Sequence, residues 1–251
     1  MAELSTRPFN SSTASRAGAL DEGLRSFMLG TYNYMALGVA GTAIVTLLLV
    51  SNPSALAAVA SLKWGIFFAT LGLGWFAPRL IQGGSAVVAH GAYWAYCALW
   101  GALIAPMVYV FVSKGAVGLV SQAFFISAAT FATASVIGYT TKKDMTGWSG
   151  FLSMASIGLL LTSLVSFFFI TDPGTSTTVS FVISAVVVLL FSVMTAWETQ
   201  AIKSMYLHEA SHGNEASLKR SSIFGAFMLY GSFVTLFVHI LNMLGIMNNE
   251  N

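Results

Sequence analysis

Long apolar runs recur along the chain and are separated by short polar segments. A helix that crosses about 30 Å of hydrocarbon at about 1.5 Å per residue needs about 20 residues. The runs lack the alternation of apolar and polar residues that barrel strands require, so they predict helices. Seven are expected, at residues 26–50, 64–81, 85–112, 119–139, 148–170, 178–197 and 222–246. The pattern predicts an all-α, polytopic membrane protein.

The polar segments predict how these helices are joined. Ser51-Asn52-Pro53-Ser54 and residues 171–174 have turn compositions, and residues 140–147 form a short charged loop. Residues 200–221 are the one long polar connection, which begins as an amphipathic extension of the sixth helix toward Tyr206. We therefore expect three parts: a disordered cytoplasmic tail at 1–25, a seven-helix domain at 26–246 and a short extracytoplasmic tail at 247–251.

The composition supports the membrane assignment. Apolar residues make up 56% of the 251 residues and charged residues only 8%, against about 45–50% and about 25% in soluble domains. This excludes a soluble enzyme, a nucleic-acid-binding protein and a disulfide-rich secreted module. The single cysteine, Cys97, lies inside an apolar run and is expected to be a small buried residue.

The distribution of Lys and Arg predicts the orientation, because these residues favour the cytoplasmic side. With a cytoplasmic N-terminus and seven alternating spans, nine of the eleven basic residues lie on the cytoplasmic side, and only Lys63 and Lys114 lie on the other. We therefore expect a multi-pass protein of a bacterial inner membrane with its C-terminus outside.

One acidic residue is expected at membrane depth. Glu198 lies near the end of the sixth run, about eight residues before the expected helix end at Tyr206. Glu198 is either an interfacial carboxylate that reaches water or a buried carboxylate that faces the bundle. A carboxylate buried in the bundle would indicate a functional site, because ionisable groups are costly at membrane depth.

The seventh run carries a polar stripe. Ser232, Thr235, His239 and Asn242 are spaced by three, four and three residues and share one helix face. This face either forms hydrogen bonds between helices or lines a permeation path. Arg79, at the end of the second run, is either a positive anchor at the membrane surface or a partner that latches Glu198.

The segment His208-Glu209-Ala210-Ser211-His212 matches the zinc-protease pattern His-Glu-x-x-His. We expect it to lie in the polar connection and not within a long helix, where it would be a solvated charged face. No enzymatic activity, metal site or cofactor is therefore predicted.

Four segments resemble the bacterial branch of the Bax-inhibitor (TMBIM) family, over nearly all of the chain after about residue 20. They are residues 32–38, Gly138-Tyr139-Thr140-Thr141-Lys142-Lys143-Asp144, residues 195–200 and residues 229–245. The resemblance implies a seven-helix bundle with the last helix central. It also implies either a pH-sensitive calcium leak, known for some members, or regulation of a membrane protease, known for some bacterial relatives.

The sequence departs from the family at the site that this resemblance implies. The family's leak uses an aspartate on each of the sixth and seventh helices and an arginine on the second. Glu198 stands at the first aspartate, Ser232 replaces the second, and Arg79 matches the arginine within one residue. Asn242 also stands where an arginine is common. Two close carboxylates can share a proton, whereas a carboxylate and a serine hydroxyl cannot be coupled in this way. Calcium prefers six to eight oxygen ligands, so one glutamate with hydroxyl groups is expected to be a weak calcium site.

Two hypotheses follow for a chain embedded in the lipid bilayer. In the first, Glu198, Ser232, Thr235 and His239 line a leak for calcium, protons or other cations, with Arg79 as a latch that acid releases. In the second, the protein conducts nothing and regulates membrane-protein quality control, binding a membrane protease complex through its helix faces and residues 200–221.

Overall fold

The computed structural model describes residues 11–170, 172–212 and 215–249. Within them every regular element is a helix. The long helices are α1 (Ser11–Val50), α3 (Lys63–Gly83), α4 (Ala86–Ser113), α5 (Val117–Thr140), α6 (Ser149–Phe169), α7 (Pro173–His212) and α8 (Glu215–Asn249). The short ones are α2 (Pro53–Ser61) and the 3-10 turn η1 (Thr146–Trp148). In this part of the chain, seven helices are long and apolar enough to cross a membrane, which confirms the predicted fold class.

Helix α1 begins earlier than the sequence pattern predicts. The expected disordered tail at 1–25 is helical from Ser11 onward, while residues 1–10 lie outside the described part. Where α1 enters the bundle, Leu24 and Met28 are buried, and the Phe27 and Tyr206 rings are tilted with their centroids 5.2 Å apart. This packing places the helix from about Leu24 onward against the C-terminal part of α7.

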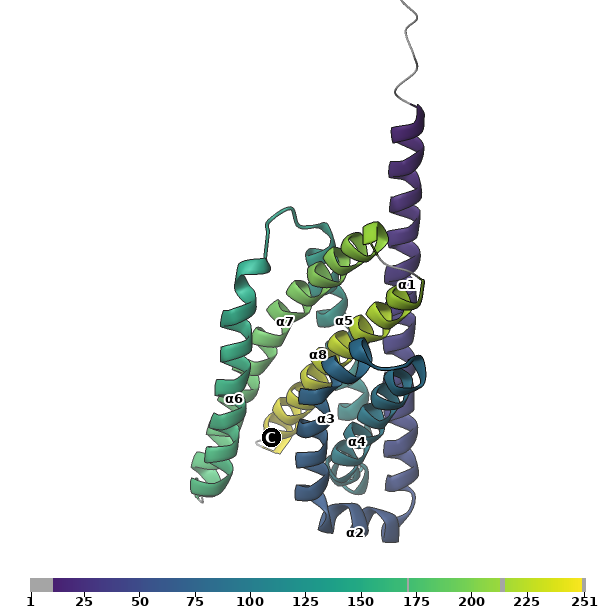
Figure 1. Ribbon diagram of the computed structural model, residues 1–251. Coiled ribbons are helices and arrows are strands. Elements are labelled where there is room, and N and C mark those ends of the chain that lie inside the picture. The colour runs from purple at the N-terminus through teal and green to yellow at the C-terminus, as the bar shows by residue number, and fades with distance from the viewer. Residues whose placement is uncertain (1–10, 171, 213–214, 250–251) are drawn as a thin grey trace, which may run out of the picture.

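Helix α2 is an element that the analysis of the sequence missed. It lies within the connection after the first span and runs across the end of the bundle (Figure 1). Asn52 caps it, accepting a hydrogen bond of 3.2 Å from the Ala55 amide, and Pro53 occupies its first turn. A capping Asn followed by Pro is a helix-start signal, so the segment at residues 51–54 that the composition predicts as a turn begins a helix.

The predicted long polar connection at 200–221 is almost entirely helical. Helix α7 continues to His212 and α8 already begins at Glu215, with residues 213–214 outside the described part. The expectation that His208 and His212 lie outside a long helix is therefore wrong. The third predicted part, the tail at 247–251, is likewise helical as far as Asn249.

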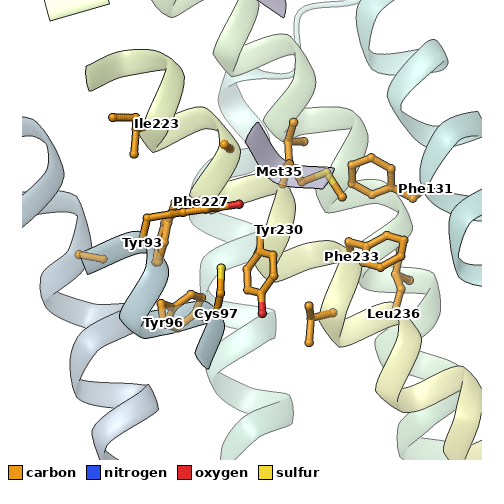
Figure 2. Close-up of a cluster of buried hydrophobic side chains, with 14 of the residues drawn as sticks. Met35, Tyr93, Tyr96, Cys97, Phe131, Ile223, Phe227, Tyr230, Phe233 and Leu236 are labelled. Atoms are coloured by element: carbon orange, nitrogen blue, oxygen red, sulfur yellow. The ribbon is translucent and has the colours of Figure 1, made fainter. Parts of the chain in front are cut away.

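Helix α8 is the centre of the bundle. It packs against α1, α3, α4, α5 and α7, whereas α6 lies at the edge and packs against α7 (Figure 1). Figure 2 shows the core around α8, in which Phe227, Tyr230 and Phe233 meet side chains from α1, α4 and α5. Cys97 is part of this cluster and is buried, as the sequence predicts.

Candidate functional site

A cavity of about 760 Å³ lies between α3, α4 and α6, over the faces of α7 and α8. Its formation follows from the position of α6, which packs on α7 and makes no close backbone contact with α3 in the described part of the chain. The walls are mostly apolar and aromatic, and they include Trp64, Trp100 and Phe227. At one end of α3, Trp64 stacks at 5.5 Å on Phe168 of α6 and bridges the two helices.

Glu198 of α7 lines this cavity and is only 6% exposed. Of the two positions open from the sequence, the structure has the buried carboxylate that faces the bundle. Its Oε2 atom has no hydrogen-bond partner among the described residues. The neighbouring hydroxyls do not serve it, because Thr195 and Thr199 donate to carbonyl groups one turn earlier in α7.

Ser232 of α8 lies next to the Glu198 carboxyl group and lines the same cavity. It is 1% exposed, and its Oγ has no hydrogen-bond partner among the described residues. One turn further along α8, Thr235 also lines the cavity and donates a hydrogen bond of 2.8 Å to the Gly231 carbonyl. The structure therefore brings these three predicted site residues together.

His239 continues the polar face of α8 into a second cavity of about 270 Å³, and both cavities share His239 and Ser163. The Nδ1 atom of His239 lies 3.0 Å from Ser184 Oγ on α7. Asn242 donates hydrogen bonds of 2.9 Å to the hydroxyls of Ser180 and Ser184. The stripe thus forms hydrogen bonds that join α8 to α7 and also lines the two cavities.

Arg79 is not brought to this site. It is exposed on α3 and lines a separate hollow with Gly72, Leu73, Phe76 and Leu80. In this conformation Arg79 therefore does not lie beside the Glu198 carboxylate.

Packed side chains separate Glu198 from the C-terminal end of α7. Thr199 and Ile202 are completely buried, and Ile202 lies against Gly225 of α8. In the other direction the two cavities follow α8 toward its C-terminal end. Packed side chains therefore close the site toward the C-terminal end of α7, and cavities extend from it toward the C-terminal end of α8.

Trp100 of α4 is a third unpaired polar group at the large cavity, and reasoning from the sequence missed it. Its indole Nε1–H is buried and has no hydrogen-bond acceptor among the described residues. A tryptophan inside an apolar run carries no sequence signal for such a position, because its partners come from other helices.

Gln200 was also missed, although it lies in one of the segments that resemble the family. Its Oε1 accepts a hydrogen bond of 2.7 Å from the Met145 amide, and its Nε2 donates one of 2.9 Å to the Lys143 carbonyl. Gln200 therefore anchors the charged loop after α5 to α7. A polar residue two positions after Glu198 was the available signal.

The described residues hold no group of three or more His, Cys, Asp or Glu side chains arranged to bind a metal ion. One carboxylate with serine and threonine hydroxyls offers oxygen ligands for a single cation, or acceptors for a ligand that carries hydrogen-bond donors.

Comparisons with known proteins place this architecture in a family. The model of the family described as "Inhibitor of apoptosis-promoting Bax1" matches residues 24–249. An uncharacterised protein of Caulobacter vibrioides is 36% identical over 90% of this chain and 91% of its own length. An uncharacterised protein of Rickettsia prowazekii is 32% identical over 93% and 94% of the two chains.

A named relative gives the cellular location. The inner membrane protein YbhL of Escherichia coli is 30% identical over 89% of this chain and 92% of its own length. With seven membrane-length apolar helices, this similarity identifies a multi-pass inner membrane protein. The chain belongs to the Bax-inhibitor family.

Proposed function

We propose that the protein provides a leak path for small cations along the cavities beside α8. The observation that carries the proposal is the Glu198 carboxylate, which is buried in a cavity and leaves Oε2 without a partner. An unpaired carboxylate inside a membrane protein is expensive and marks an ion path or a binding site. On the neighbouring helix α8, Ser232, Thr235 and His239 form a polar face that lines the same cavity and leads away from Glu198.

The ligand set favours small cations of low charge over calcium. Calcium prefers six to eight oxygens, several of them from carboxylates, and among the described residues Glu198 is the one acidic residue that lines either cavity. The hydroxyl oxygens that line the cavity are only weak additional ligands for calcium. We therefore infer that protons or monovalent cations pass more readily than calcium.

The proposal does not require the arginine latch. Because Arg79 is exposed and lines another hollow, acid would act on Glu198 itself. Protonation of Glu198 removes its negative charge from the cavity, which raises the barrier for a cation in a medium of low dielectric constant. Acid should therefore reduce the leak, in contrast to the expectation based on a latch.

Ion flux into proteoliposomes tests the proposal. The full chain is reconstituted, and potassium, proton and calcium fluxes are measured from pH 8 to pH 5 beside empty vesicles. Glu198→Gln keeps the shape of the side chain and removes its charge, so we expect a lower flux without dependence on pH. Glu209→Gln is the matched control, because Glu209 lies on the same helix but outside both of these cavities.

Flux equal to that of empty vesicles at every pH would overturn the proposal. A flux that Glu198→Gln and Glu209→Gln change equally would also contradict it, because the carboxylate in the cavity would then have no special role.

We also propose the orientation, with the N-terminus in the cytoplasm, which the distribution of Lys and Arg supports. Single cysteines introduced by Lys142→Cys and Lys114→Cys in a Cys97→Ser background test it. We expect a membrane-impermeant maleimide to label the second variant in intact spheroplasts and the first only after lysis. The opposite pattern would invert the topology.

A second candidate function is regulation of a membrane protease through helix contacts. The observation that favours it is helix α6, which packs on α7 alone among the long helices and exposes Phe151, Met154 and Leu161. Co-purification with a protease complex that persists in Glu198→Gln and is lost when these three positions are changed to Ala would support this function. A protein that conducts cations and co-purifies with no protease would exclude it.

A further inference from the structure

Three of the four unpaired buried side-chain atoms in the described part of the chain line one cavity. They are Glu198 Oε2, Ser232 Oγ and Trp100 Nε1, and they come from α7, α8 and α4. Buried polar atoms without partners are rare in folded proteins, and each calls for an explanation. Their convergence on one cavity indicates that a ligand supplies the missing partners.

The three atoms specify the hydrogen-bonding groups of that ligand. The carboxylate accepts hydrogen bonds, the indole N–H donates one, and the hydroxyl does either. A matching ligand therefore has a donor for Glu198 and an acceptor for Trp100. A cationic donor fits best, because it also neutralises the buried charge.

The rest of the cavity specifies an apolar body. Aromatic rings from Trp64, Phe67, Tyr96 and Phe227 line it, and its volume of about 760 Å³ matches that of sites for drug-sized molecules. Tyr96 and Phe227 pack at 4.7 Å, and Trp100 meets Tyr96 edge to face at 6.3 Å. Aromatic faces also attract organic cations.

The position of α6 provides a route of entry from the bilayer. The described residues of α3 and α6 make no close backbone contact, and Trp64 and Phe168 stack across the gap between the two helices. A molecule that dissolves in the membrane can therefore reach the site laterally.

We propose that this cavity binds a lipophilic amine that also carries a hydrogen-bond acceptor, with its ammonium group on Glu198 and Ser232, its acceptor facing the Trp100 N–H and its apolar body between α3, α4 and α6. A hydrated metal ion would leave the aromatic walls without a function, and a lipid acyl chain would leave all three polar atoms unpaired. This binding does not depend on ion conduction, so its test stands apart from that of the leak.

Monodansylcadaverine is a suitable probe, because it joins a primary amine to a fluorophore whose emission rises in apolar surroundings. The full chain is placed in nanodiscs of zwitterionic phosphatidylcholine, and the emission from empty nanodiscs is subtracted. The N-acetyl derivative is the matched ligand control, since it keeps the fluorophore and the chain but cannot carry the charge.

We expect saturable binding of the amine that is at least about tenfold tighter than that of the acetylated probe, as for one charge-assisted hydrogen bond. Glu198→Gln should remove this difference, and Ser232→Ala should reduce it. Glu209→Gln should leave it unchanged, because Glu209 lies outside the cavity.

A second variant tests the position of the apolar body. Gly231 lines the cavity, and a Cβ atom added there meets Tyr96 Oη at 3.9 Å as its one neighbour within 4 Å. Gly231→Leu therefore projects into free space and should weaken binding of both probes. If Glu198→Gln does not fold, Ser232→Ala and Gly231→Leu decide the outcome. Equal affinity for the two probes, amine binding that the folded variants leave unchanged, or no saturable binding to the unmodified chain would each overturn the proposal.

Discussion

The Glu198 carboxyl group on α7 and the Ser232 hydroxyl on α8 lie next to each other in one cavity, and each leaves an oxygen without a hydrogen-bond partner. The two residues lie on neighbouring long helices and are both almost completely buried. Because Glu198 Oε2 and Ser232 Oγ lack hydrogen-bond partners, the two residues are suited to receive a cation or a hydrogen-bond donor.

Replacing Ser232 with a second acid should create a calcium site. In Ser232→Asp two carboxylates share the cavity and supply several of the oxygens that calcium needs. We expect terbium, which substitutes for calcium, to bind this variant at least about tenfold more tightly than the unmodified chain. Luminescence excited through the nearby aromatic residues measures it, with Ser232→Asn as the uncharged control. Equal binding to both variants would contradict the prediction.

Removing the buried charge should stabilise the protein. Glu198→Gln replaces a carboxylate that lacks a partner at Oε2 with a neutral amide that can donate to Ser232. Because an unpaired buried polar group destabilises the folded state by about 1–3 kcal/mol, we expect unfolding at higher temperature. Thermal unfolding in detergent, followed by tryptophan fluorescence, provides the measurement, and Glu209→Gln should show no such gain. A lower unfolding temperature for Glu198→Gln would indicate an ionic partner that stabilises the carboxylate.

Gly138 should tolerate no side chain, because α5 and α7 approach each other there. A Cβ atom at Gly138 would lie 2.1 Å from the Ala196 carbonyl oxygen, two residues before Glu198. Gly138→Ala must push the two helices apart, and we expect a loss of about 1–3 kcal/mol in stability, typical of overpacking. Gly91→Ala is the control, since a Cβ there has no neighbour within 4 Å. Thermal unfolding of both variants should separate them, and equal effects would refute the close approach.

The loop after α5 should loosen when its anchor is removed. Gln200 bonds to the backbone of both Lys143 and Met145. In Gln200→Ala the Met145 amide loses its acceptor, so we expect faster hydrogen exchange there. Exchange measured by mass spectrometry on peptides that cover residues 141–148 tests this, and peptides from α4 serve as the internal control. Unchanged exchange in the loop would show that Gln200 does not hold it.

The turn at Asp144 should depend on pH. Hydrogen bonds from the Thr146 hydroxyl and from the Thr146 amide, which lies 2.9 Å from Asp144 Oδ1, lower the pKa of Asp144 below its usual value. The ionised carboxylate therefore stabilises the turn at neutral pH, and this contribution disappears as the pH falls through the lowered pKa. The chemical shift of the Thr146 amide nitrogen should follow that titration. In Asp144→Asn the dependence should be absent, and a midpoint at or above the ordinary aspartate value would contradict these bonds.

The boundaries of the helices show how far an apolar pattern predicts structure. The predicted span at 119–139 corresponds closely to α5 (Val117–Thr140), because long apolar runs must form helices in lipid. The prediction is less accurate where helices leave the apolar layer. Residues 11–25 and 200–221 are polar, yet most of them are helical, and buried residues such as Leu24 and Tyr206 pack parts of these segments onto the bundle.

The candidate site was predictable in part. Glu198, Ser232, Thr235 and His239 stand out because polar groups are rare in such helices, and all four line the large cavity. Arg79 also stands out by its charge, but a helix can direct such a residue to any side, and α3 leaves it exposed. Trp100 could not be found, because its unpaired N–H depends on which side chains other helices bring to it.

Two glycines show the same division between local pattern and tertiary structure. Gly91 and Gly138 both occur in long apolar helices, yet only Gly138 lies against the backbone of a neighbouring helix. The amino-acid sequence alone determines that seven helices cross the membrane and that few charges enter it, because hydrocarbon excludes open backbone and ions whatever the packing. Only the tertiary structure decides that α6 lies apart from α3, that a cavity opens between them, and that Glu198, Ser232 and Trp100 meet in it. These are distances between segments far apart in the chain, which depend on how all the helices pack together.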